Sequence, residues 1–363
     1  MQTLRVLHDS TTQGERMVTG VSFVVPVHNG AAHLAETLAS IGAQADGRPI
    51  EIIVVEDGST DGSAALLRSL TSTSRLTVVA GPGRGAAAAV NAGVRLAAHS
   101  IVCQVDQDVV LGHGWMRTLV DALDDPTVGA AQGCYVTDPR GSFFTRVMGL
   151  DLEQRYSRLG AHIDHVCTGN TAYRVTALHA VGLLDESLGY GYDNDLSYRL
   201  QAAGYRLAFC RDARSHHRWR EGLVGYLAQQ YGFGYGRLDV IARHPTRLAG
   251  DAVSPARMMG HPLVMGLALS LLAAGALLAA LSGRGFGLFA AGGVLLLALA
   301  IERVIAGARA CKQFGDAAAL AFPLVHMARD LAWIAAILAW AVRRLLRRPL
   351  RPEHSMSARP ASR

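Results

Sequence analysis

Short apolar runs alternate with amphipathic stretches along the first third of the chain. The apolar runs predict strands at residues 21–26, 51–55, 76–80 and 101–105. The stretches between and after them predict helices at residues 31–43, 63–70, 86–98 and 115–123. Short strands separated by helices indicate βαβ units, so we expect an α/β, Rossmann-like domain with a mostly parallel sheet. Beyond residue 130 the pattern is more mixed, which is typical of elements added at a sheet edge.

The C-terminal third has a different pattern, with three long apolar segments. Residues 262–281 are almost free of charge and long enough to cross a bilayer. A turn at 282–285 separates them from a second apolar run at 285–301. A third apolar segment covers residues 317–342. Two such runs in tandem predict a membrane hairpin, whereas a single run would equally fit a buried helix of a soluble domain.

The third segment carries charge, which changes its expected placement. His326, Arg329, Asp330 and Trp333 share one face of a helix. A polar stripe of this kind suits the membrane–water interface or a protein-lined cavity. We therefore expect the segment to lie in the plane of the membrane, or to enter the membrane and return to the same side. Three full crossings are the alternative, but they would place an Arg-rich end outside, against the positive-inside tendency. The arginines of that end are Arg343, Arg344, Arg347, Arg348, Arg351, Arg359 and Arg363.

Composition narrows the possible partners. The chain has 363 residues, 50% of them hydrophobic, and a net charge of +6. Because no aromatic residues interleave with the terminal arginines, we expect a contact with anionic lipid and no nucleic-acid partner. The five cysteines are scattered without a CxxC pair, which favours buried thiols over disulfides or zinc. The first residues lack a basic region followed by an apolar core, so we expect no signal peptide.

These patterns divide the chain into five parts. We expect a flexible arm at 1–19, an α/β domain at 20–245 and a linker at 246–261. Membrane helices follow at 262–345, and a basic disordered tail at 346–363.

Two aspartates end the fourth predicted strand. Asp106 and Asp108 follow the apolar run directly, and alternation along an extended chain points both carboxylates the same way. Open α/β sheets bind ligands at the carboxyl ends of their strands. Two hard oxygen donors at that place suit Mg²⁺ or Mn²⁺ shared with substrate phosphates, although a polar turn would show the same residues.

Polar residues follow two other predicted strands. Residues 26–29 come after the first strand, and Asp57 comes after the second, between Glu56 and Gly58. Thr60 or Asp61 can cap the next helix. A carboxylate such as that of Asp57 can accept a hydrogen bond from a nucleobase or a ribose. Three strand ends therefore converge on one crevice.

These motifs together resemble family 2 glycosyltransferases of the GT-A fold. The similarity covers roughly residues 20–240, and its motifs lie at 24–29, 54–62, 85–93 and 105–108. The resemblance implies a nucleotide-diphosphate sugar of UDP or GDP type as donor, with Asp106 on ribose or metal and Asp108 on the metal. His28 stands where family members often carry Tyr. The nucleotide-sugar-binding residues that the resemblance implies are Pro26, Val27, His28, Asp57, Arg84, Asp106 and Gln107.

The resemblance continues in the second half of the domain. Residues 167–174 resemble the family's acceptor loop, which implies Gly169 and Asn170 on the acceptor side. Residues 189–200 resemble a helix start with Asp193 at the position of the catalytic base and Asp195 nearby, although Tyr192 replaces the usual Glu. We expect the helix dipole to keep Asp193 ionised, ready to accept a proton from an acceptor hydroxyl; a plain helix cap is the alternative.

Two further segments refine the expectation. His216 or His217 is a candidate metal ligand, and because adjacent residues of a strand point apart, we expect one of them to serve; a basic surface patch is the alternative. Residues 229–237 resemble the family's acceptor-side Gln and Tyr-Gly segment. They lack the Gln-x-x-Arg-Trp of processive synthases, which favours addition of a single sugar.

Two other functions are alternatives that the sequence also allows. Residues 81–86 match the dinucleotide-binding fingerprint between a strand and a helix, which would fit an NADP-dependent oxidoreductase. A non-catalytic, membrane-anchored sugar-nucleotide-binding module is the other alternative. The favoured hypothesis is an inverting glycosyltransferase at the inner cell membrane. Its catalytic domain would lie in the cytosol and its acceptor would be a lipid-linked or other saccharide.

Overall fold

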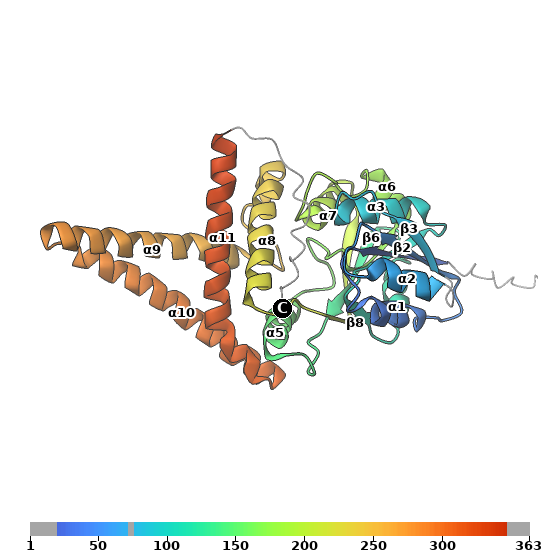
Figure 1. Cartoon of the computed structure of the whole chain (residues 1–363), viewed down its shortest axis with the longest axis horizontal. Coiled ribbons are helices and arrows are strands. Elements are labelled where there is room, and N and C mark those ends of the chain that lie inside the picture. The colour runs from blue at the N-terminus through green and yellow to red at the C-terminus, as the bar shows by residue number, and fades with distance from the viewer. Residues whose placement is uncertain (1–19, 72–75, 347–363) are drawn as a thin grey trace, which may run out of the picture.

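A computed structural model describes residues 20–71 and 76–346 (Figure 1). The expected arm at 1–19 lies outside the described residues, and so does the expected tail except for its first residue. Eight strands form one sheet in the order β3-β2-β1-β4-β7-β6-β8-β5. The strands are β1 Val21–Val27, β2 Ile50–Glu56, β3 Leu76–Ala80, β4 Ile101–Val105, β5 Val109–Leu111, β6 Val128–Tyr135, β7 Asn170–Arg174 and β8 Arg206–His217.

The helices of the catalytic domain connect and cover these strands. They are α1 Leu34–Gly42, α2 Ser63–Thr71, α3 Ala86–Leu96, α4 Trp115–Ala122, α5 Phe143–Tyr156, α6 Val175–Ala180, α7 Tyr192–Ala202 and α8 Leu223–Arg243. Each of the four strands and four helices predicted for the first third is present, with ends shifted by at most a few residues. The predicted α/β, Rossmann-like domain is confirmed.

The sheet is mostly parallel, and one reversed strand lies within it. β1 pairs in parallel with β2 and β4, and β2 with β3. β7 runs antiparallel between β4 and β6, and β5 pairs antiparallel with the end of β8. Every residue of β4 is buried, which explains why its sequence reads as a continuous run rather than an alternating pattern. β6 is also buried throughout, but its sequence mixes small and polar residues with apolar ones. As their spacing predicts, the cysteines are unpaired.

Three long helices follow the catalytic domain. They are α9 Ala256–Ser282, α10 Phe286–Phe314 and α11 Phe322–Leu345, the last preceded by the short 3₁₀ helix η2 Ala317–Ala321. α9 begins inside the range expected as a linker, and α10 continues well past the predicted apolar run. All three segments are long and apolar enough to cross a membrane.

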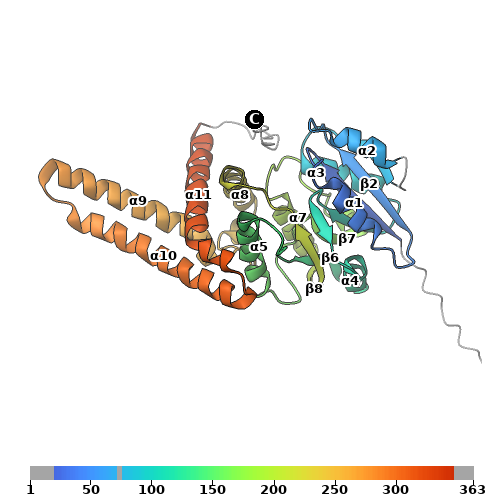
Figure 2. The same ribbon diagram turned by 60° about the horizontal axis from the view of Figure 1, so that its bottom comes forward.

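The three helices are not parallel to one another. α9 and α10 form a hairpin that projects away from the sheet, whereas α11 runs across the base of that hairpin, beside α8 (Figures 1 and 2). Glycines on α8 allow close packing against the catalytic domain on one side of this helix and against α11 on the other. A Cβ atom at Gly232 or Gly236 would overlap Tyr190, and one at Gly234 would lie 3.1 Å from Cγ of Trp333 in α11. The 229–237 segment therefore brings the catalytic domain and α11 close together.

Candidate active site

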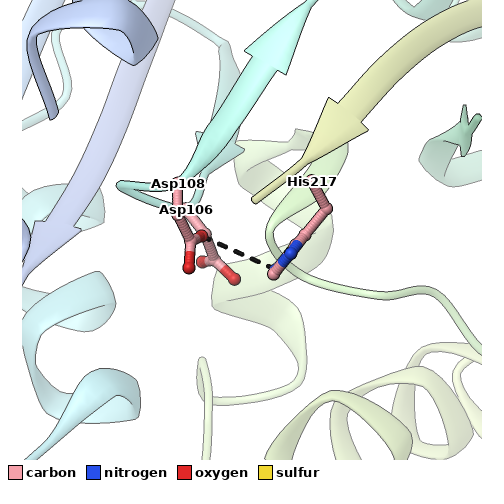
Figure 3. Close-up of side chains that lie close together, drawn as sticks. All are labelled: Asp106, Asp108 and His217. Carbon is pink, nitrogen blue, oxygen red and sulfur yellow. Dashed lines mark ion pairs between the residues drawn. The ribbon is translucent and has the colours of Figure 1, made fainter. Parts of the chain in front are cut away.

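Two carboxylates and one imidazole gather at the carboxyl end of β4. Asp106, Asp108 and His217 each offer a ligand atom, and these atoms lie within 4.8 Å of one another (Figure 3). His217 Nε2 lies 3.6 Å from Asp108 Oδ1. The cluster depends on strand pairing, because β5 follows Asp108 directly and its Val109 pairs with His217 at the end of β8. Residues more than a hundred positions apart thus meet at one point.

The electrostatics of this cluster fit a divalent cation. Burial, together with the charges of Asp108 and Asp193, raises the pKa of Asp106 to about 7. Bringing like charges together costs free energy unless a proton or a cation offsets it. Burial also lowers the pKa of His217, which favours the neutral imidazole that ligates metals. The donor set therefore fits Mg²⁺ or Mn²⁺.

The structure distinguishes the two adjacent histidines. His216 turns away from the cluster, and its Nδ1 lies 3.1 Å from the carbonyl oxygen of Val136. His217 stacks on Trp219 at 4.2 Å between ring centroids and meets the edge of Tyr135 at 5.5 Å. Sequence reasoning missed both aromatic residues. β8 ends at His217, and the backbone N–H of Trp219 donates to the carbonyl of His217 at 3.0 Å, so a turn that strand alternation does not predict brings the two rings together.

Asp106 is held by its immediate neighbours. Gln104 Nε2 donates to its Oδ1 at 2.9 Å, and the loop before β7 approaches so closely that a Cβ at Gly169 would overlap its carboxylate. Asn170, expected on the acceptor side, is fully buried, and its Oδ1 accepts from Trp115 Nε1 at 2.6 Å. Gly169 thus borders the metal cluster, whereas the Asn170 side chain packs in the core.

Asp193 lies in the first turn of α7, and its charge reaches the cluster, since it raises the pKa of Asp106. The sequence predicts that the helix dipole keeps Asp193 ionised. Burial has the larger effect in the structure and raises its pKa. Asp195 contacts other partners: Oδ2 accepts from Arg199 Nε at 2.8 Å and Oδ1 lies 2.8 Å from His244 Nε2. Asp195 therefore ties α7 to the end of α8.

The Asp57 carboxylate holds the glycine-rich loop after β3. Its Oδ1 accepts from the backbone N–H of Gly83 at 2.6 Å and its Oδ2 from that of Gly85 at 3.0 Å. A dinucleotide-binding loop needs such amides for a pyrophosphate. Because both amides already donate to Asp57, the geometry does not support the NADP alternative. Asp57 is also almost fully buried and has its remaining lone pairs for a ligand.

The residues after β1 are held by Gln107. Its Oε1 accepts from the backbone N–H of His28 at 2.9 Å, and its Nε2 donates to the carbonyl of His28 at 3.0 Å. Both ends of the amide are thus engaged with the backbone, so Gln107 holds the residues after β1 in place. Val27 is buried in the core, Pro26 is half-buried, and His28 Nδ1 lies 3.0 Å from the carbonyl oxygen of Asp57.

Arg84, in the loop after β3, has an exposed side chain. Its guanidinium lies 2.9 Å from Glu186 Oε2, in the segment between α6 and α7. Glu186 also accepts from Asn91 Nδ2 at 3.0 Å. Sequence reasoning missed Glu186, since no local pattern links it to the loop after β3.

Several known glycosyltransferases are similar to this chain. Residues 22–182 match the family model described as Glycosyl transferase family 2. The chain is 30% identical over 297 residues to a pre-mycofactocin glycosyltransferase of Mycobacterium tuberculosis, an alignment that covers 77% of this chain and 61% of the relative. It is 28% identical over 270 residues to a succinoglycan biosynthesis protein of Rhizobium meliloti, covering 72% and 78% of the two chains. The chain thus spans about three fifths of the length of the mycobacterial relative.

Solved structures show the same fold. A mannosyltransferase from Pyrobaculum calidifontis, solved with GDP-Man and Mn²⁺, superposes with a TM-score of 0.58 at 22% identity and covers 91% of this chain and 88% of its own. The crystal structure of GalNAc-T7 with UDP, GalNAc and Mn²⁺ gives a TM-score of 0.50 at 16% identity, covering 63% and 48%.

Proposed function

We propose that this chain, whose residues 22–182 match the model of glycosyl transferase family 2, is a membrane-associated, inverting enzyme that uses a nucleotide-diphosphate sugar. The gathering of Asp106, Asp108 and His217 within 4.8 Å at the carboxyl end of β4 carries the proposal. A catalytic role needs a site for the departing diphosphate, and this cluster lies where open α/β sheets bind ligands. A binding module would have no need of Asp193, whose charge acts on Asp106.

The cluster would hold a divalent cation that offsets the negative charge developing on the departing nucleoside diphosphate. Asp106, Asp108 and His217 are its proposed ligands. The carboxylates suit Mg²⁺ and Mn²⁺ alike, and the imidazole fits a transition metal better than Mg²⁺, so we favour Mn²⁺.

Asp193 is the proposed general base. A raised pKa brings a carboxylate closer to neutral pH, where a general base is most effective. The acceptor hydroxyl would lose its proton to Asp193 as its oxygen attacks the anomeric carbon, and the bond from that carbon to the diphosphate oxygen would break. Direct displacement, in which the acceptor oxygen attacks the face opposite the departing diphosphate, inverts the anomeric centre.

The donor and acceptor classes remain proposals. The Pyrobaculum structure contains GDP-Man, and the relatives include N-acetylglucosaminyltransferases, so a UDP or GDP sugar is proposed for this chain. We propose a lipid-linked or other saccharide acceptor, because the catalytic domain packs directly against apolar helices. Fold and anchoring do not identify the sugar.

The orientation of the helices supports two crossings. If the α9–α10 hairpin spans the bilayer, α11 lies crosswise at its base and cannot span in the same direction (Figures 1 and 2). The polar stripe of α11 faces protein: His326 Nε2 lies 3.1 Å from Asp151 Oδ1 in α5, and Asp330 accepts from Arg303 in α10. Its opposite side exposes Leu324, Leu331, Leu338 and Leu345. We therefore propose an interfacial α11 with the catalytic domain in the cytosol, at the inner cell membrane.

A donor screen tests the proposed function. Purified protein in detergent is incubated with Mn²⁺ and a panel of UDP and GDP sugars, and release of the nucleoside diphosphate is measured. We expect release of the nucleoside diphosphate either from UDP sugars or from GDP sugars. The anomeric configuration of the product, determined by NMR, should be inverted relative to the donor. The thermal stability of the protein is measured with each nucleotide as well. An increase with NADP, but with no nucleoside diphosphate, would contradict the proposal.

A further inference from the structure

A short turn follows the proposed metal ligand His217 at the end of β8. Two backbone hydrogen bonds fix its course: the N–H of Trp219 donates to the carbonyl of His217 at 3.0 Å, and the N–H of Arg218 donates to the carbonyl of Asp108 at 2.8 Å. Asp108 directly precedes β5, so the second bond joins the turn to the other side of the metal cluster. The turn and the Asp108 backbone therefore keep one position relative to each other.

Arg218 also anchors the turn through its side chain. Its Nε donates to Glu36 Oε2 in α1 at 3.1 Å, and its Nη1 donates to Asp138 Oδ2, between β6 and α5, at 2.6 Å. Charge-assisted hydrogen bonds to two separate elements hold an arginine more firmly than a single surface ion pair does. The backbone that carries Trp219, the next residue, is therefore well anchored.

The His217 imidazole lies against two aromatic rings. Trp219 stacks on it with ring centroids 4.2 Å apart and 26° between the ring planes. The buried Tyr135 meets the imidazole edge-on at 5.5 Å and the Trp219 ring at 6.0 Å. Ring pairs of these geometries are favourable beyond the apolar area that they bury. The two rings thus restrict rotation of the imidazole about its Cβ–Cγ bond.

No hydrogen bond from the protein takes over this role. Metal-ligating histidines usually donate from their second ring nitrogen to a carboxylate, a carbonyl or water, which fixes the orientation of the ring. In His217, Nε2 lies 3.6 Å from Asp108 Oδ1, and Nδ1 is buried. Within residues 20–71 and 76–346, Nδ1 has no hydrogen-bond partner. Ring contacts therefore hold Nε2 toward the Asp108 carboxylate.

We infer that Trp219 is a positioning residue, which orients the His217 imidazole so that Nε2 can ligate the divalent cation beside Asp108. The inference rests on the proposed function, because it takes His217 as a ligand of that cation. Trp219 acts through His217. Its removal should therefore lower the affinity for a metal that binds imidazole well, such as Mn²⁺, and should have no effect where His217 is missing.

Mn²⁺ affinity of the full chain in detergent tests the inference. It is measured from the EPR signal of free Mn²⁺ for wild type and for variants of Trp219. We expect Trp219→Ala to weaken Mn²⁺ binding roughly 10-fold, the lower end of what the loss of an outer-shell partner causes. Trp219→Phe should stay close to wild type, because a phenyl ring can stack on the imidazole in the same place. Equal weakening in both variants would contradict a role of stacking.

A double-mutant cycle separates positioning from a general structural role. In the background His217→Ala, the change Trp219→Ala should cause no further loss of Mn²⁺ affinity. In the matched background His216→Ala, it should cause the same loss as in wild type, since His216 Nδ1 lies against the carbonyl of Val136 instead. Equal further losses in the two backgrounds would show that Trp219 does not act through His217, and would overturn the inference.

The remaining outcomes separate the inference from the proposed function. Unchanged Mn²⁺ affinity in Trp219→Ala, together with weaker binding in His217→Ala, would overturn the inference and leave the proposed metal site in place. Loss of turnover in Trp219→Ala at unchanged Mn²⁺ affinity would also overturn it, and would indicate that Trp219 contacts a substrate. Absence of Mn²⁺ binding in wild type would contradict the metal site of the proposed function, and the inference with it.

Discussion

Gly169 lies directly against Asp106: a Cβ atom at Gly169 would overlap the Asp106 carboxylate. The backbone N–H of Asp106 also donates to the carbonyl of Gly169 at 3.2 Å. The loop before β7 therefore sets the position of a proposed metal ligand.

Gly169→Ala should displace the Asp106 carboxylate and lower turnover by roughly 10²-fold, the effect that a displacement of about 1 Å can have in an active site. The measurement is nucleoside diphosphate release at saturating Mn²⁺. Gly160→Ala is the matched control, because the nearest atom to its Cβ would be His162 O at 4.0 Å. Similar rates for the two variants would show that the close approach has no catalytic importance.

Asp108→Ala should abolish turnover and leave the fold intact, because the departing diphosphate loses its counter-charge. EDTA should have the same effect on wild type, and added Mn²⁺ should restore activity. Asp46→Ala, which removes an ion pair with Arg48 away from the site, serves as control. Full activity in EDTA would disprove the metal role.

The variants His217→Ala and His216→Ala should differ in their affinity for Mn²⁺. Loss of a ligand should weaken Mn²⁺ binding at least by the roughly 10–100-fold typical of outer-shell partners. His216 faces Val136, so its removal should leave Mn²⁺ binding close to wild type. Titration followed by the EPR signal of free Mn²⁺ gives both affinities. Equal weakening in the two variants would contradict the assignment of His217.

Asp193→Asn should lower kcat by roughly 10²–10⁴, as is typical when a general base is removed. Donor binding, measured by calorimetry, should change little because the metal cluster is intact. Asp195→Asn provides the comparison: it weakens the contacts with Arg199 and His244, so it should reduce thermal stability more than kcat. Wild-type kcat in Asp193→Asn would leave Asp193 as a structural cap.

Single cysteines at Ser282 and Ser357 should differ in labelling of intact cells by an impermeant maleimide. Ser282 ends α9 at the hairpin turn and should be labelled from outside. Ser357 lies among the terminal arginines and should be labelled only after permeabilisation. Labelling of Ser357 in intact cells would mean three crossings, with α11 spanning the membrane.

The linear pattern was sufficient for the first half of the fold. The runs that form β1 to β4 are short, apolar and separated by segments with helical periodicity. The local preference of these residues for strands and their burial in the core therefore favour the same elements. The Asp pair after β4 could also be found, because strand alternation and strand-end chemistry are local properties. Polar residues at three strand ends then predicted one shared site, and length and hydropathy alone predicted the two long apolar helices of the α9–α10 hairpin.

The tertiary structure decided which side chains lie together at the proposed site. Selection of His217 over His216 depends on the pairing of β8 with β5, and such register between distant segments has no local signal. Gln107 looked like a ligand-binding residue but binds the backbone of His28, and the dipole expected to govern Asp193 is outweighed by burial. The contacts of Arg218 with Glu36 and Asp138 likewise join segments distant in the chain. The sequence by itself determined the elements and the class of chemistry, because both depend on short-range patterns. Only packing between distant segments decided the orientation, burial and charge of the individual groups.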